Sequence, residues 1–157
     1  MLYLLKRLSL KGNLMPVMVQ SVYRNAGATR LRLVLFTSKI SAGFPSPAED
    51  YIDKNLDLNE HLIKHPAATF FIRVEGHSMI NAGIHNGDML IVDRTLEPVD
   101  KKIVIAVING EMTVKRIRML KGKLYLMPEN DSFKPIEVSE EADLQIWGVV
   151  TSVIHSV

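Results

Sequence analysis

Short runs of apolar and β-branched residues, separated by turn residues, dominate the second half of the chain. Runs of this kind are typical of β-strands, and here they lie at Thr69–Glu75, Met89–Asp93, Ile103–Ile108, Glu111–Met119, Lys123–Met127 and Ile146–Ile154. The Asn109-Gly110 pair predicts a two-residue hairpin between two of them. Short helices are expected at Pro47–Tyr51 and Leu58–Lys64, the second ending before Pro66. Many short strands and few helices predict a compact, mainly β domain.

The first 42 residues have a different pattern. Residues 17–36 contain apolar residues without a clear period, which leaves open short strands or a disordered segment. Small residues, a glycine and two prolines follow at Ser41–Pro47, which is typical of a boundary. We therefore expect a flexible N-terminal arm, residues 1–42, and a β-rich domain, residues 43–157. The arm shows no convincing helix-turn-helix, so sequence-specific DNA binding is not expected.

The charge is distributed unequally between these two parts. Residues 1–42 hold seven Lys or Arg residues and no acidic residue, a charge of +7. Residues 43–157 hold 12 basic and 17 acidic residues, a charge of −5. The arm could dock on the acidic domain, on nucleic acid or on an acidic partner, or remain a solvated tail.

The composition excludes several kinds of chemistry. The 157-residue chain has no cysteine, so disulfides, zinc–thiolate sites, iron–sulfur clusters and thiol catalysis are excluded. His61 and His65 lack the internal glutamate of a His-Glu-x-x-His zinc motif, and no Gly-rich phosphate loop precedes a helix. No apolar run approaches the roughly 18 residues needed to span a bilayer. We expect a cytoplasmic protein without a metal, a cofactor or a membrane anchor.

A first candidate for catalysis is Ser78. It follows Gly76 directly after a predicted strand, at the expected first turn of a helix, where backbone N–H groups could stabilise an oxyanion. A serine after a glycine is more often a cap or turn residue, however, and a serine nucleophile needs a base.

Lys115 is the candidate base. Alternation along the strand places Lys115 on one face with Thr113, Ile117 and Met119, and places Val114, Arg116 and Arg118 on the opposite, wet face. A lysine among apolar side chains has a lowered pKa and can accept the serine proton when neutral, with Thr113 orienting the amine. The alternative is that Lys115 reaches solvent from a strand edge.

Several motifs at consistent spacing resemble the self-cleaving Ser-Lys peptidase domain of the LexA/UmuD family. They are Gly76–Met79, Gly83–Asp93 and Gly110–Arg116, and Lys115 lies 37 positions after Ser78. Upstream, Ala42–Tyr51 is similar to the cleavage-site region of UmuD-type proteins. The resemblance covers roughly residues 42–155.

This resemblance implies that Ser78 is the nucleophile, that Lys115 is the general base, and that Thr113, Met79 and Gly76 support them. The scissile bond would be Ala42-Gly43. A RecA filament on single-stranded DNA would stimulate the cut during the SOS response, and the shortened homodimer would join a UmuC-type polymerase for translesion DNA synthesis. The arm is longer than is usual in the family, so residues 1–17 are interpreted either as an extension or as a wrongly assigned start, with Met18 as the other start.

Three other functions are alternatives to this one. A LexA- or phage-type repressor with a reduced DNA-binding part is the main alternative, and the missing recognition helix argues against it. A signal peptidase would need a membrane anchor. A scaffold without activity would not need both Ser78 and Lys115.

Overall fold

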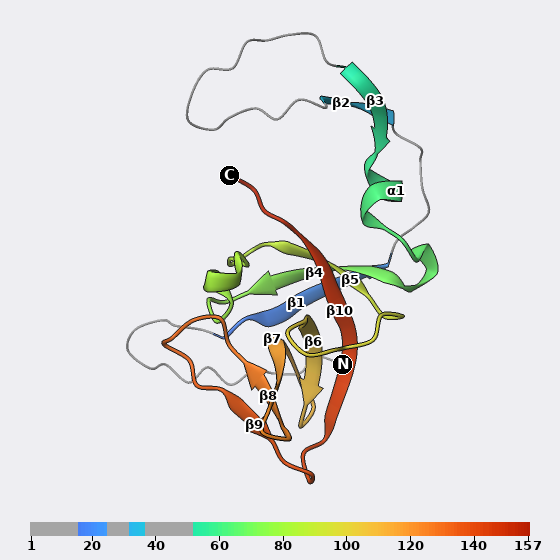
Figure 1. Ribbon diagram of the computed structural model, residues 1–157. Helices are drawn as coiled ribbons and strands as arrows, with labels where there is room; N and C mark the ends of the chain where they lie inside the picture. Colours follow the sequence, from blue (N-terminus) through green and yellow to red (C-terminus); the bar gives the residue numbers. More distant parts are fainter. Residues whose placement is uncertain (1–15, 25–31, 37–51) are drawn as a thin grey trace, which may run out of the picture.

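The larger part of the protein is an antiparallel eight-stranded sheet that closes on itself (Figure 1). The computed structural model describes residues 16–24, 32–36 and 52–157. Its elements, in chain order, are β1 Met18–Arg24, β2 Arg32–Phe36, β3 Ile52–Asp57, α1 Leu58–Leu62, the 3₁₀ turn η1 Pro66–Ala68, β4 Thr69–Glu75, the 3₁₀ turn η2 Ile80–Ala82, β5 Met89–Asp93, β6 Ile103–Ile108, β7 Glu111–Leu120, β8 Lys123–Met127, β9 Ile136–Val138 and β10 Leu144–Ile154.

The strand order brings the first strand of the chain against the site. It runs β1-β4-β5-β10-β6-β7-β8-β9, and a further pairing of β1 with β7, Met18 opposite Thr113, closes the ring. β1 also pairs with β4 from Met18 opposite Glu75 to Arg24 opposite Phe70. The closing strand therefore comes from the predicted arm. Of the two alternatives left open for residues 17–36, short strands apply at β1 and β2.

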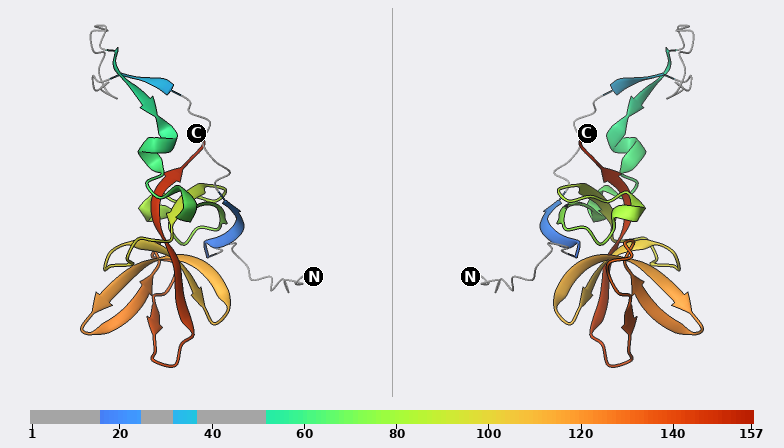
Figure 2. Two further views of the ribbon diagram at one scale, coloured as in Figure 1. Left: turned by 90° about the vertical axis from the view of Figure 1, so that its right-hand side faces the viewer. Right: turned by 90° about the vertical axis from the view of Figure 1, so that its left-hand side faces the viewer.

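A second sheet lies apart from this ring. β2 and β3 pair antiparallel, and together with α1 they extend away from the body of the larger sheet (Figures 1 and 2). The predicted helix at Leu58–Lys64 is confirmed as α1, which is shorter than expected. Asp57 caps it by accepting hydrogen bonds from the backbone N–H groups of Asn59 and Glu60. The predicted boundary after Ala42 and the predicted helix at Pro47–Tyr51 lie outside the described residues.

The predicted strands agree closely with the observed ones from β4 onward. β4, β5, β6 and β8 have the predicted bounds, and β7 and β10 are slightly longer. The hairpin at residues 109–110 is confirmed, since Asn109 and Gly110 both have positive φ, at 50° and 82°. β3 and β9 were not predicted, because β3 has no clear alternating pattern and β9 has only three residues. No helix of the described part of the chain is long and apolar enough to cross a membrane.

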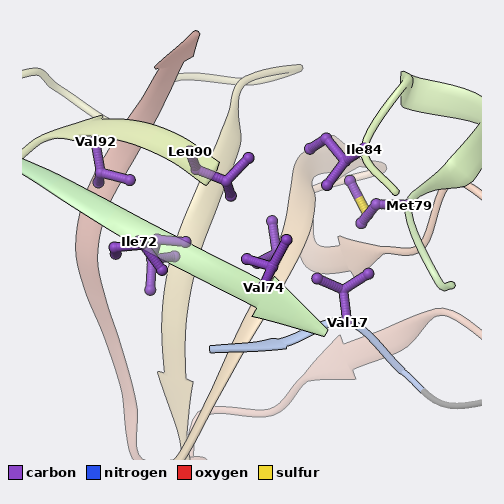
Figure 3. Packing of buried hydrophobic residues seen from close by; sticks show 9 residues of the cluster. Val17, Ile72, Val74, Met79, Ile84, Leu90 and Val92 are labelled. Atoms are coloured by element: carbon purple, nitrogen blue, oxygen red, sulfur yellow. The ribbon is translucent and has the colours of Figure 1, made fainter. Parts of the chain in front are cut away.

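Two clusters of buried side chains fill the ring. The one nearer the site is formed by Val17, Ile72, Val74, Met79, Ile84, Leu90, Val92, Ile105 and Val114 (Figure 3). The other is formed by Val104, Ala106, Ile117, Leu126 and Val149. Val17, immediately before β1, is completely buried, so the arm contributes directly to the core.

Gly148 allows β10 to lie close to its neighbouring strand β5. A Cβ atom at this position would lie 2.7 Å from Val92 Cγ1 and 3.2 Å from the Asp93 carbonyl oxygen. We predict that Gly148→Ala lowers the free energy of unfolding by about 1–3 kcal/mol, because the well-packed core must shift to admit the methyl group. Urea unfolding measures the loss.

The matched control removes the atom that the new methyl group meets. In Gly148→Ala/Val92→Ala the loss should be smaller than the sum of the two single losses, because Val92 Cγ1 is gone. Additive losses would contradict the steric explanation.

Candidate active site

Ser78 lies in a turn that leaves the end of β4. Gly76 makes this turn with φ of 112°, a conformation that a residue with a Cβ atom adopts rarely. The Gly76 N–H donates to Asn86 Oδ1 at 2.9 Å, which fixes the turn to the loop before β5. Ser78 is completely buried. The predicted helix after it is only the 3₁₀ turn η2, since Met79 has φ and ψ of −125° and 19° and the chain bends again at Gly83.

A distant loop fastens the backbone around Ser78. The Glu129 N–H donates to the Ser78 carbonyl at 2.8 Å, and Asn130 Nδ2 donates to the His77 carbonyl at 2.8 Å. The Glu129 side chain pairs with Arg116, the residue that follows Lys115 on β7. This loop therefore holds the Ser78 turn and β7 together. The sequence indicated only a turn here.

Lys115 approaches Ser78 from the middle of β7. Its side chain points inward, as the alternation predicts, and the residue is 4% exposed. Its Nζ lies 3.1 Å from Ser78 Oγ, 3.0 Å from Thr113 Oγ1 and 2.9 Å from the Val114 carbonyl oxygen. The alternation is wrong at Val114, which is buried rather than wet, because β1 and the Ser78 turn cover this end of β7. Met119, expected on the inner face, is exposed.

The three oxygens around Lys115 can be satisfied by a neutral amine. Burial lowers the pKa of Lys115 from 10.5 to about 8. A neutral amine has two N–H donors and one lone pair. The Val114 carbonyl can only accept, and Thr113 Oγ1 donates its own hydrogen to the Val17 carbonyl at 3.1 Å, so it accepts from Lys115. The lone pair is left for the Ser78 hydroxyl.

The remaining neighbour of Ser78 comes from the arm. The Val17 N–H donates to Ser78 Oγ at 2.9 Å, across 61 positions of sequence. The structure thus brings together Gly76, Ser78, Met79, Thr113 and Lys115, with Met79 completely buried next to Ser78. The sequence did not indicate Val17. Ala42 and Gly43, the predicted scissile pair, lie outside the described residues.

Among the residues that the structure describes, one cluster has the donor atoms to hold a metal ion. Ligand atoms of His85, Asp88 and His155 lie within 4.8 Å of one another. The Asp88 carboxylate is buried and already accepts from His155 Nδ1 at 2.7 Å and from the His85 backbone N–H at 2.7 Å. These hydrogen bonds connect His155, the residue after β10, to the β4–β5 loop. This structural role explains why the three side chains lie close together.

Comparison with known proteins assigns the chain to a family. The sequence profile described as Peptidase S24-like matches residues 34–151. The chain belongs to this family. It is 49% identical to Protein SamA of Salmonella typhimurium over 121 residues, 77% of this chain and 84% of the relative. It is 43% identical to Protein MucA of Escherichia coli over 132 residues, 83% and 90% of the two chains. It is 36% identical to the LexA repressor of Hahella chejuensis over 154 residues, 96% and 76% of the two.

Membership in the Peptidase S24-like family confirms the resemblance to UmuD-like proteins and the mainly β fold. It supports a self-cleaving serine peptidase related to the SOS response. The family match does not by itself identify the nucleophile, the base or the bond that is cut.

The buried amine predicts a pH-dependent stability. The folded chain loses the Lys115 proton near pH 8 and the unfolded chain near pH 10.5, so the unfolded state binds more protons between these values. Stability contributed by the neutral amine is therefore gained as the pH rises through this window. In Ser78→Ala, which should not cleave, the free energy of unfolding should rise by roughly 3 kcal/mol from pH 8 to 10.5 relative to Ser78→Ala/Lys115→Met. Equal pH profiles of the two variants would show that Lys115 is charged in the fold.

Proposed function

We propose that this protein is a self-cleaving serine peptidase of the SOS response, which cuts its own Ala42-Gly43 bond with Ser78 as nucleophile and Lys115 as general base. The observation that carries the proposal is a buried amine 3.1 Å from a buried hydroxyl, in surroundings that lower the pKa of the amine to about 8. A serine hydroxyl is a weak nucleophile until a neighbouring base takes its proton.

The reaction proceeds in two steps, formation of an ester on Ser78 and hydrolysis of that ester. The Ser78 hydroxyl attacks the Ala42 carbonyl carbon while its proton passes to Lys115. The tetrahedral intermediate then breaks the C–N bond, Lys115 returns the proton to the Gly43 nitrogen, and Ala42 remains as an ester on Ser78. Lys115 next takes a proton from water, the resulting hydroxide attacks the ester, and the Ser78 oxygen recovers a proton as the Ala42 carboxylate leaves. The net reaction consumes one water for one peptide bond.

A modest catalyst is sufficient for this task. The bond belongs to the same molecule or to its dimer partner, so its effective concentration is high. Ala42 suits a small pocket, and Gly43 allows close approach of the backbone to Ser78. An activator need only raise the fraction of molecules in which the bond occupies the site.

The partners are proposed from the relatives. With UmuD-like proteins at 43–50% identity, the chain would form a homodimer in the cytoplasm, and residues 43–157 would serve as the accessory subunit of a UmuC-type translesion polymerase. A RecA filament on single-stranded DNA would be the activator.

A LexA-type repressor is the second candidate, because the match to a protein named LexA repressor covers 96% of this chain. Among the described residues the only α-helix, α1, has five residues, too short to serve as a recognition helix. A mobility-shift experiment with duplex and single-stranded DNA distinguishes the two, since a repressor would bind a particular duplex far more tightly than random DNA.

Cleavage should accelerate with pH as Lys115 loses its proton. With a pKa of about 8, roughly a tenth of the amine is neutral at pH 7 and nearly all of it at pH 10, so the rate should rise roughly tenfold and level off above pH 8–9. Mass spectrometry of the incubated chain should find fragments 1–42 and 43–157. An activated RecA filament should raise the rate at pH 7.

Two variants test the dyad in the same assay. Ser78→Ala and Lys115→Ala should each abolish the cut at every pH, with and without RecA. Continued cleavage by either variant would exclude this mechanism, whereas cleavage at another bond would retain the dyad and correct the scissile pair.

Thr113 is expected to act as a positioning residue. Its hydroxyl joins Lys115 Nζ to the Val17 carbonyl, so Thr113→Val removes one of the two acceptors that orient the neutral amine. We expect the rate to fall by about tenfold, with the pH profile displaced, because the lone pair of Lys115 is less well aimed. Thr113→Ser keeps the hydroxyl and should restore most of the rate. A slow Thr113→Ser enzyme with a normal pH profile would indicate a packing role only.

A further inference from the structure

Val17 occupies the position beside Ser78 that a peptide substrate must enter. Its N–H donates to Ser78 Oγ at 2.9 Å, and its carbonyl accepts from Thr113 Oγ1 at 3.1 Å and from the Val114 N–H at 3.4 Å. Both backbone polar groups of Val17 are therefore bonded to the site. The residue is completely buried.

The Val17 side chain also fills the apolar space next to the nucleophile. It belongs to the same buried cluster as Val74, Met79 and Ile84, and Figure 3 shows it pointing toward Val74. These residues come from β4 and from the segment that follows Ser78. A substrate side chain bound beside Ser78 would meet the same walls.

The backbone of Val17 is held in an orientation that cannot be cut. A peptide N–H lies in the plane of its amide group, so a hydroxyl oxygen that accepts from the Val17 N–H lies near that plane. Attack on the Pro16 carbonyl carbon would have to come from above the plane. The Val17 carbonyl is directed to Thr113 and Val114 instead. Ser78 therefore binds this peptide as an acceptor and does not face it as a nucleophile.

The strand that follows fastens Val17 in place. β1 pairs with β4 through Val19 opposite Val74, Ser21 opposite Arg73 and on to Arg24 opposite Phe70. Because Met18 also pairs with Thr113 on β7, removal of Val17 requires separation of β1 from both strands next to the site. Val17 is thus held beside Ser78 by the strand pairing of the fold itself.

We infer that Pro16–Met18 is a built-in competitor for the peptide-binding groove of this enzyme, and that β1 must leave before the scissile segment can bind. This inference rests on the proposed function and adds to it the step that limits the rate of cleavage, the release of β1. The molecules able to cleave are then the fraction with β1 released, and any partner that favours release accelerates cleavage. Loss of the buried Val17 contacts should raise that fraction by roughly tenfold to a hundredfold.

A reversible covalent lock tests this inference. Directly opposed residues of antiparallel strands have Cα atoms about 4.5–5.5 Å apart, which suits a disulfide. The chain has no native cysteine, so Ser21→Cys/Arg73→Cys introduces the only pair. We expect the oxidised double variant to cleave at least about tenfold more slowly than its reduced form, with dithiothreitol restoring the rate. The samples are reduced only after quenching, so that fragments joined by the disulfide are counted.

Three outcomes are distinguishable. If the oxidised and reduced forms cleave equally fast, with the disulfide verified by mass, β1 does not block the site and the inference is wrong. If no form cleaves at any pH, the proposed function itself fails. If only the oxidised form is slow, while Ser21→Cys and Arg73→Cys alone are unaffected by oxidation, the inference holds.

Release of the competitor is tested from the opposite direction. A chain that begins at Met18 lacks Val17, and Val17→Gly keeps the backbone but removes the buried side chain. Both should cleave faster than the full chain at pH 7 without RecA, and both retain β1 for folding. Unchanged rates in both, in chains whose circular dichroism matches the full chain, would overturn the inference while leaving the peptidase intact.

Discussion

The structure depends on the exclusion of water from one amine. A lysine nitrogen in an apolar interior favours its neutral form, and Lys115 is 4% exposed with a pKa lowered to about 8. Three oxygens surround it, from Ser78, Thr113 and Val114, so the nitrogen is desolvated without losing its hydrogen bonds. Water is excluded by the closure of the sheet, because β1, β4 and β7 surround this end of the ring. In the resting protein the lowered pKa of Lys115 is thus a consequence of how the first strand packs, and a scissile segment that replaces Val17 must exclude water in the same way.

Much of the fold could be predicted because strand formation from β4 onward is encoded locally. Runs such as Met89–Asp93 and Ile103–Ile108 are apolar over their whole length and bounded by turn residues, and the positive φ of Asn109 and Gly110 is a property of those residue types. The pairing of β1 with β4 and β7 is different. This pairing joins strands that lie far apart in the sequence. The alternating pattern of a strand does not specify which other strand will pair with it or pack over it. For the same reason the face that carries Val114 was expected to be wet, whereas Val114 itself is buried in the core.

The residues of the candidate site also divide into those that the sequence could indicate and those that it could not. Ser78 and Lys115 could be proposed from a glycine turn, an inward lysine and motif spacing, because the proposed mechanism acts through their side chains. Val17, Glu129 and Asn130 could not. Val17 and Glu129 act on Ser78 through backbone N–H groups, which every residue but proline possesses, so their identity gives no signal. Asn130 acts through its side chain on a backbone carbonyl, and nothing in the sequence indicates which carbonyl it will reach.

If the chain is cut at Ala42-Gly43 as proposed, bond cleavage and release of the arm become separate events. β1 and β2 lie before that bond, while their partners β4 and β3 lie after it, so hydrolysis leaves the two fragments paired through backbone hydrogen bonds. The charges of +7 and −5 on the two fragments also attract each other. Salt weakens that attraction without affecting Val17 in the core. The lifetime of the cleaved but undissociated protein is therefore governed chiefly by strand pairing and apolar burial. A partner that captures the edges of β3 and β4 as β2 and β1 leave them can promote release without any part in the chemical step.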